Sequence, residues 1–228
     1  LPPDAELVSR ACPQAPTGAC LDEEDLRGAA ALAESRGFRL LVDETGRELR
    51  FAGPLPAAAS LSSRALSLGG LDPVYGVPAL RVGWILCPDP DLYARLLEEK
   101  GRLGLGGGLE EPLGLAALRR RGRWLPDLRV RLAEAFRVLR EWMEGQELLR
   151  WVPPQGGFTA FPRLDPGLDP KRFVGIAAER YGVLVAPGSR FGAPEGFFRL
   201  GFGAPDPEEL ETGLAGLTAA AWDLKEES

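Results

Sequence analysis

The sequence of 228 residues contains no histidine, and this absence excludes several classes of active site at once. Without an imidazole there is no Ser-His-Asp triad, no Cys-His pair, no HExxH zinc site and no histidine general base. Asparagine is also absent, methionine occurs once, and the lysines are Lys100, Lys171 and Lys225. Scarcity of thermolabile residues is typical of a heat-adapted (thermophile) protein. Any chemistry that needs a lysine therefore has three candidates.

Cysteine is scarce as well. Cys12, Cys20 and Cys87 lie far apart and form no CxxC pair, so neither a disulfide framework nor a metal site is indicated. We expect small buried thiols in a reducing cytoplasm. No apolar run is long enough to cross a bilayer, and no charged-then-apolar leader opens the chain. The sequence predicts a cytoplasmic protein with no membrane partner; since it begins at Leu1, a processed chain and a fragment both stay open.

What is present is the composition of a globular protein. Hydrophobic residues make up 45% and charged residues 26% of the chain, and this length can bury a sizeable core. The formal net charge is −6. A nucleic-acid backbone requires a positive surface, so the charge predicts no nucleic-acid partner.

Strands and helices alternate through the first hundred residues. Apolar runs, proline and glycine stops and acidic first turns predict strands at 6–12, 38–42, 64–68 and 80–86 and helices at 22–34 and 89–100. This order is typical of a parallel α/β sheet with right-handed crossovers.

The pattern changes after a glycine-rich stretch at 101–108. The stretch lacks the GxGxxG order and follows no strand, so we interpret it as a flexible connection and not a phosphate cradle. Beyond it we predict helices at 113–121, 125–149, 170–181 and 207–222 and strands at 157–161, 182–186 and 197–202. We therefore predict two domains, 1–108 and 109–228.

Four motifs, in order along nearly the whole chain, carry a family resemblance. Residues 13–18 are similar to the aminotransferase turn N-P-x-N-P-T-G, and 40–44 to a strand ending in D-E-x-Y. Residues 67–84 resemble the stretch S-L-G-x-x-S-K-x-Y-G-L-P-G-L-R-x-G-W. Residues 183–202 resemble the C-terminal block that ends in a substrate-binding arginine. The chain resembles the C-terminal part of a class I/II aminotransferase, an enzyme family that uses pyridoxal phosphate (PLP).

The resemblance implies a fold and a set of roles. The fold is α/β: the C-terminal part of a PLP-transferase large domain, with a mostly parallel sheet and helices, followed by a small α+β domain. Asp43 would hold the pyridine nitrogen of the cofactor protonated, Arg81 would bind its phosphate, and Arg199 would bind a substrate carboxylate. Read from the residues alone, Asp43 could brace its strand end, Arg81 could pair with Asp72 or Glu44, and Arg199 could be a surface charge.

The same motifs depart from the family at four positions. The asparagine before P-T-G is Ala15, and the tyrosine of D-E-x-Y is Gly46. The Schiff-base lysine is Pro73 and the serine before it is Asp72, whose charge repels a phosphate. Proline offers no amine, so we predict no catalytic residue and no covalently bound cofactor, with Asp43 and Arg81 as vestigial contacts.

The resemblance also begins late in the family pattern, so we expect the family's N-terminal portion, with half of the site's walls, to be absent. A sheet edge should then lie open unless a second copy or a partner chain covers it. The leading hypothesis is an aminotransferase-like binding, regulatory or partner subunit that lacks transaminase activity. Two alternatives stay open: one half of a split PLP-dependent aminotransferase completed by another chain, and a plain binder of small carboxylates at Arg199.

Overall fold

The computed structural model describes residues 2, 4–71, 74–75, 77–104 and 108–227. The chain forms two compact units, and each has its own core. The first unit comprises Leu1–Gln14 and Cys20–Pro126, and the second comprises Ala15–Ala19 and Asp127–Ser228. A short piece of the N-terminal region, 15–19, thus belongs to the second unit.

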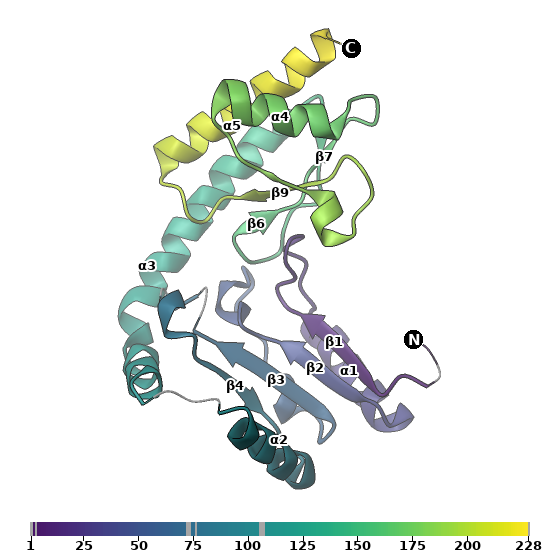
Figure 1. Cartoon of the computed structure of the whole chain (residues 1–228), viewed down its shortest axis with the longest axis vertical. Coiled ribbons are helices and arrows are strands. Elements are labelled where there is room, and N and C mark those ends of the chain that lie inside the picture. The colour runs from purple at the N-terminus through teal and green to yellow at the C-terminus, as the bar shows by residue number, and fades with distance from the viewer. Residues whose placement is uncertain (1, 3, 72–73, 76, 105–107, 228) are drawn as a thin grey trace. The chain divides into compact units, whose positions relative to one another are not determined.

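The first unit is built on a four-stranded sheet in the order β1-β2-β3-β4 (Figure 1). The strands are β1 (Leu7–Ala11), β2 (Arg39–Asp43), β3 (Ala65–Gly70) and β4 (Gly83–Leu86). The pairs β1-β2 and β2-β3 are parallel, and β3-β4 is antiparallel. The sheet is therefore mostly parallel, as predicted, with one reversed strand at its edge.

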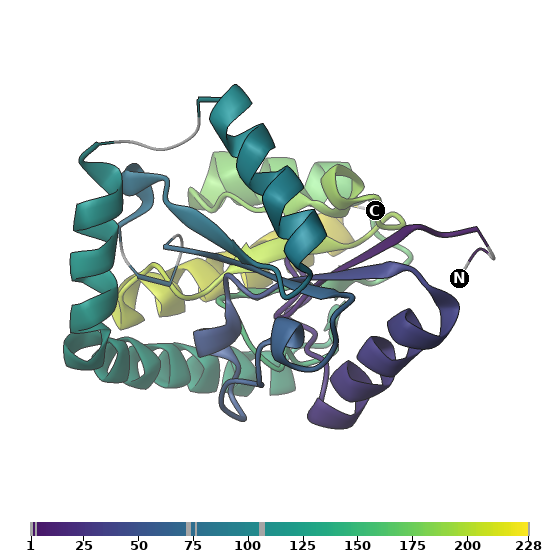
Figure 2. The same ribbon diagram turned by 90° about the horizontal axis from the view of Figure 1, so that it is seen from below.

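Helices lie on opposite sides of this sheet (Figure 2). Helix α1 (Glu23–Arg36) begins after Asp22, whose side chain accepts a hydrogen bond from the Asp25 N–H, and ends at Gly37 in the left-handed conformation. Helix α2 (Pro90–Arg102) begins in the same way after Asp89. Both helices begin and end within two residues of the predicted bounds, because the capping residues can be recognised in the sequence.

The core of the first unit lies between α1 and the sheet. Burial of apolar side chains, at roughly 25 cal/mol per Å² removed from water, is what holds the helix in place. The buried cluster consists of Cys12, Leu26, Ala30, Ala33, Phe38, Leu40, Val42, Ala58 and Ala65.

The predicted helices at 113–121 and 125–149 are one helix, α3 (Glu110–Glu144), with Pro126 inside it. The predicted break between residues 121 and 125 was wrong, because the helix is continuous there and runs on through Pro126. In the second part of the helix, Leu132, Leu139 and Met143 are buried.

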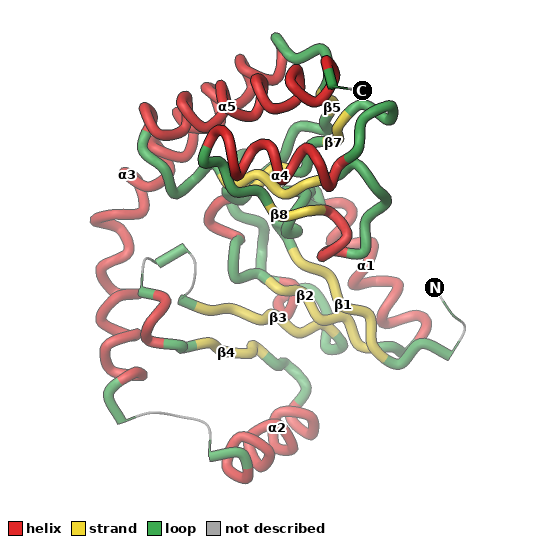
Figure 3. Tube along the Cα trace, turned by 45° about the horizontal axis from the view of Figure 1, so that its top comes forward, coloured by secondary structure: helices red, strands yellow, loops and turns green. Residues whose placement is uncertain are grey.

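The second unit combines α3 with two short sheets and two further helices (Figure 3). One sheet pairs β5 (Leu149–Arg150) with β7 (Arg163–Leu164), and the other has the order β6 (Thr159–Ala160), β9 (Phe198–Gly201), β8 (Ala186–Pro187). Helices α4 (Pro170–Tyr181) and α5 (Pro207–Glu226) pack together. Phe173 of α4 meets Phe198 of β9 at a centroid distance of 5.1 Å and both are fully buried, so the helices are anchored on the sheet.

Four short 3₁₀ segments complete the described structure: Arg47–Leu49, Ala58–Ser60, Pro78–Leu80 and Gly188–Phe191. The compact units divide inside α3, whereas we expected a domain boundary at 108/109. The reason is that the start of α3 packs on the first unit: Trp124 contacts Tyr75 edge-on at 5.5 Å. The assignment of 1–108 and 109–228 as two domains stays a prediction.

Within the described residues, none of the helices combines the length and apolarity that a membrane span would need.

Candidate functional site

Asp43 lies where the parallel strand β2 ends, the edge at which α/β proteins place ligands. Its Oδ1 atom accepts hydrogen bonds from the backbone N–H of Thr45 at 3.0 Å and from the Thr45 hydroxyl at 2.7 Å. The side chain is half-buried. These bonds fix the carboxylate at the strand end, so Asp43 can accept a bond from a ligand N–H there while also bracing its own turn.

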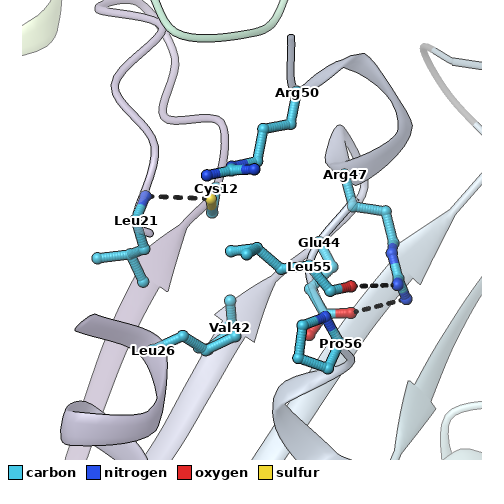
Figure 4. Close-up of a pocket in the computed structure, with 9 residues that line it drawn as sticks. All are labelled: Cys12, Leu21, Leu26, Val42, Glu44, Arg47, Arg50, Leu55 and Pro56. Carbon is cyan, nitrogen blue, oxygen red and sulfur yellow. Dashed lines mark hydrogen bonds and ion pairs between the residues drawn. The ribbon is translucent and has the colours of Figure 1, made fainter. Parts of the chain in front are cut away.

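Glu44, the next residue, is buried and fully engaged. Its Oε1 atom accepts from the Ala58 N–H at 2.7 Å and from the Ser67 hydroxyl at 2.6 Å. Its Oε2 atom pairs with Arg47 at 3.4 Å (Figure 4). Arg47 also donates to the Leu55 carbonyl at 2.5 Å. Glu44 therefore links β2 to β3 and to the loop at 55–58. These contacts do not include Arg81, which the sequence had left open as a partner of Glu44.

The turn at 13–18 is held from two directions. Gly46 lies against Pro13: a Cβ on Gly46 would come 3.1 Å from Pro13 Cδ. Further along, the Gly18 carbonyl accepts from the N–H groups of Gln155 and Gly156, at 2.9 and 3.1 Å. Gly18 has φ +69°, and a Cβ there would lie 2.3 Å from Pro154 Cβ, so glycine is required.

Arg81 precedes β4 and is exposed, with φ of 49°. A non-glycine residue in this left-handed region is uncommon, and such residues gather at ligand sites. Trp84 of β4 lies against Gly69 of β3, where a Cβ would come 2.2 Å from the indole Nε1 atom. Asp72 and Pro73, which the motif aligns with the family's serine and lysine, lie outside the described residues.

Arg199 lies in the second unit on the exposed face of β9. Its guanidinium stacks over the Phe191 ring at 5.3 Å, and Phe191 meets Phe161 edge-on at 6.0 Å. Phe161 stacks in turn on Phe197 at 5.2 Å. No carboxylate of the described chain forms an ion pair with Arg199. An arginine held by an aromatic ring with its donors available is suited to bidentate binding of a carboxylate.

All three lysines are exposed and lie on helices. Lys100 pairs with Glu111 at 3.2 Å, and Lys225 lies over the Trp222 ring at 4.5 Å. Lys171 is in the first turn of α4. None of them directly follows a strand, the position from which a side chain would reach a ligand at the sheet edge.

Comparison with known proteins connects these features. Residues 2–217 match the family model described as aminotransferase class I and II. The chain belongs to this family. It is 34% identical over 209 residues to capreomycidine synthase of Streptomyces vinaceus, covering 90% of this chain and 53% of that protein. It is 25% identical over 227 residues to an aspartate aminotransferase of Thermococcus kodakarensis, covering 96% of this chain and 60% of the relative.

Solved structures agree on the fold. A PLP-dependent aminotransferase from Streptococcus suis superposes with a TM-score of 0.89 at 24% identity, covering 98% of this chain and 59% of that one. The PLP-dependent cyclase OrfR gives 0.82 at 30% identity, with 97% and 59% covered. The predicted α/β aminotransferase-like fold is confirmed. This chain spans a little over half the length of these relatives.

The family is PLP-dependent, and the residues of this chain match the needs of that cofactor only in part. Asp43 is suitably held to meet a ring N–H. Pro73 and the exposed lysines provide no amine at the strand edge, and Gly46 and Ala15 provide no side-chain donor for a ring oxygen. That no cofactor is held covalently stays a prediction, which rests on Pro73 and on the positions of the lysines.

Asp43 and Arg81 thus belong to the first unit of this aminotransferase-family chain and Arg199 to the second. The roles of these residues stay predictions. Sequence reasoning missed the part that Glu44 plays in fixing the site edge. The signal available was Ser67, a polar residue inside an apolar strand, which requires a buried partner.

Proposed function

We propose that this chain is an aminotransferase-fold protein that binds a small carboxylate and acts as a binding, regulatory or partner subunit without Schiff-base chemistry. The observation that carries the proposal is where the chain places its lysine amines. A proline stands at the position that the motif aligns with the lysine, and every lysine of the chain is exposed and on a helix.

Schiff-base chemistry requires a lysine that is desolvated and close to the reacting carbon. The ammonium groups of Lys100 and Lys225 are instead engaged with Glu111 and with Trp222 at the surface. Without histidine, no imidazole can replace the amine as a proton carrier. The chain's own residues therefore support binding better than proton transfer at an amino-acid Cα.

The ligand is assigned from Arg199. Its guanidinium stays charged and forks onto carboxylate oxygens, and Phe191 orients it by stacking. A single bidentate contact at an exposed site leaves little free energy after the entropy lost on binding, so we expect a dissociation constant on the order of millimolar. A short-chain amino acid or 2-oxo acid has the required chemistry.

Titration calorimetry with pyruvate, 2-oxoglutarate and L-alanine tests the assignment. The native chain should bind at least one of them, and Arg199→Ala should weaken that binding at least about tenfold, roughly 1.4 kcal/mol. Arg163→Ala is the matched control, because Arg163 stacks over Phe197 of the same aromatic group. Equal binding by native chain and Arg199→Ala would mean that Arg199 is a surface charge only.

A second candidate is a PLP-dependent enzyme completed by another polypeptide. The favouring observation is apolar exposure at the sheet edges: Leu7 of β1 is 56% exposed, and Ile85 and Leu86 of β4 are 45% and 46% exposed. Exposed apolar strand edges are unusual unless a neighbour covers them.

The partner in this second candidate could be a second copy of the chain or a chain that supplies the lysine. Mixing with a polypeptide that corresponds to the unmatched part of capreomycidine synthase, followed by PLP and borohydride, distinguishes the candidates. A stoichiometrically labelled lysine in either polypeptide of the mixture favours the completed enzyme, and no label in either polypeptide favours the binding subunit.

A further inference from the structure

The thiols of Cys12 and Cys20 lie next to each other, although the two residues form no CxxC motif in the sequence. Cys12 follows β1 and is 5% exposed, within the buried cluster of the first unit. Cys20 is half-buried and packs against the same cluster. Both are reduced. The Cys12 sulfur accepts a hydrogen bond from the Leu21 N–H at 3.4 Å and another from the Cys20 thiol.

The surroundings of Cys12 favour a thiolate. Figure 4 shows the Arg50 guanidinium next to the Cys12 sulfur, in the wall of a cavity of about 10 Å³. The Cys20 hydrogen bond, the Leu21 N–H and the Arg50 charge lower the pKa of Cys12 to about 6, against burial and the Glu44 charge. The same hydrogen bond raises the pKa of Cys20. One sulfur is thus a nucleophile and the other a protonated neighbour.

We propose that Cys12 and Cys20 form a peroxide-sensitive dithiol that closes to a disulfide. The Cys12 thiolate attacks one oxygen of hydrogen peroxide; the O–O bond breaks, and a sulfenic acid and hydroxide are formed. The Cys20 sulfur then attacks the Cys12 sulfur, the S–O bond breaks, and the hydroxyl leaves as water with the Cys20 proton. The hydroxide takes up the proton that Cys12 lost on ionisation, so two thiols are oxidised to one disulfide and one peroxide is reduced to two waters.

The small size of the cavity selects the oxidant. The cavity beside Cys12 is small, about 10 Å³, so a small oxidant such as hydrogen peroxide reaches the sulfur more readily than a bulky disulfide does. The product would join the two ends of the segment 13–19. That segment carries Thr17 and Gly18, and its residues 15–19 belong to the second compact unit. Oxidation would therefore restrict the segment 13–19.

Peptide mapping of the full chain tests the proposal. After treatment with hydrogen peroxide, alkylation of remaining thiols and trypsin digestion, residues 11–27 form one peptide that contains both cysteines, and Cys87 lies on the peptide 82–95. We expect peptide 11–27 to lose two hydrogen atoms and to escape alkylation. We expect this to occur about tenfold faster than any oxidation of half-buried Cys87, and dithiothreitol should reverse it.

Variants separate the two sulfurs. Cys87→Ser should form the link normally, whereas Cys20→Ser should accumulate a Cys12 sulfenic acid that dimedone traps. Cys12→Ser should leave Cys20 alkylatable; if this core variant does not fold, the dimedone result on Cys20→Ser decides alone. A doubly alkylated peptide 11–27 after peroxide treatment, or oxidation of Cys87 as fast as Cys12, would overturn the proposal.

Discussion

Replacing Glu44 by leucine should destabilise the first unit by about 3 kcal/mol. Glu44 is 9% exposed, and its Oε1 atom satisfies the Ala58 N–H and the Ser67 hydroxyl. Leucine removes both acceptors, and each buried donor left without a partner costs roughly 1–3 kcal/mol. The Ser67 hydroxyl can rotate towards another acceptor, so we take the lower part of the range for it. Arg47 keeps its bond to the Leu55 carbonyl.

Glu44→Gln is the matched control, because glutamine keeps one acceptor oxygen and the side-chain shape and loses the charge that faces Arg47. We expect a loss of about 1 kcal/mol for glutamine. Urea unfolding followed by circular dichroism at pH 7 measures both, with the slope against urea unchanged. If glutamine costs as much as leucine, the charge matters and the acceptor does not. A cost below about 1 kcal/mol for leucine would refute the reasoning altogether.

Two further changes probe the structure. Gly18→Ala should lower the free energy of unfolding by more than about 2 kcal/mol, because a Cβ would lie 2.3 Å from Pro154 Cβ. Gly37→Ala, with φ +79° and open space around the position, should lower it by only about 1 kcal/mol. Thermal unfolding of both variants measures the difference. The Leu92 N–H, then the Arg39 side chain, lower the pKa of Asp89. Asp89 therefore stabilises the fold above the unfolded pKa of about 3.9 and loses this effect as pH falls through the lower folded value, so Asp89→Asn should flatten the acid limb of stability against pH.

Local signals in the sequence were enough for many elements. The helix at 170–181 has the predicted bounds because proline at its start and Gly182 after its end mark both termini. The strands β1 and β2 follow from their apolar runs. Such features are set by a few neighbouring residues, which is why they can be predicted without a fold.

Features set by tertiary contacts could not be predicted. We predicted a break between residues 121 and 125 that α3 does not have, since the first part of the helix is held by packing of Trp124 on Tyr75. The sequence spacing of Cys12 and Cys20 indicated no pair, because the contact is made by chain that leaves β1 and returns. The antiparallel direction of β4 also depends on its connection to β3 and not on its own residues.

Of the candidate site, the sequence predicted Asp43 at the end of a strand and Arg199 within a strand, and the resemblance supplied their roles. It could not give the Thr45 contacts that hold Asp43 or the Phe191 ring that orients Arg199, because these depend on side-chain positions across a turn and between segments. The identity of Pro73 needs no structure, and it carries the chemical argument.

The most direct test of the central claim is borohydride reduction of the chain after incubation with PLP. The absorption spectrum before reduction and the peptides after it show whether an amine has formed a Schiff base. With Pro73 at the motif position and Lys100, Lys171 and Lys225 exposed, we predict no visible aldimine band and no stoichiometric label on any lysine. Stoichiometric labelling of one lysine, with a matching visible band, would contradict the account.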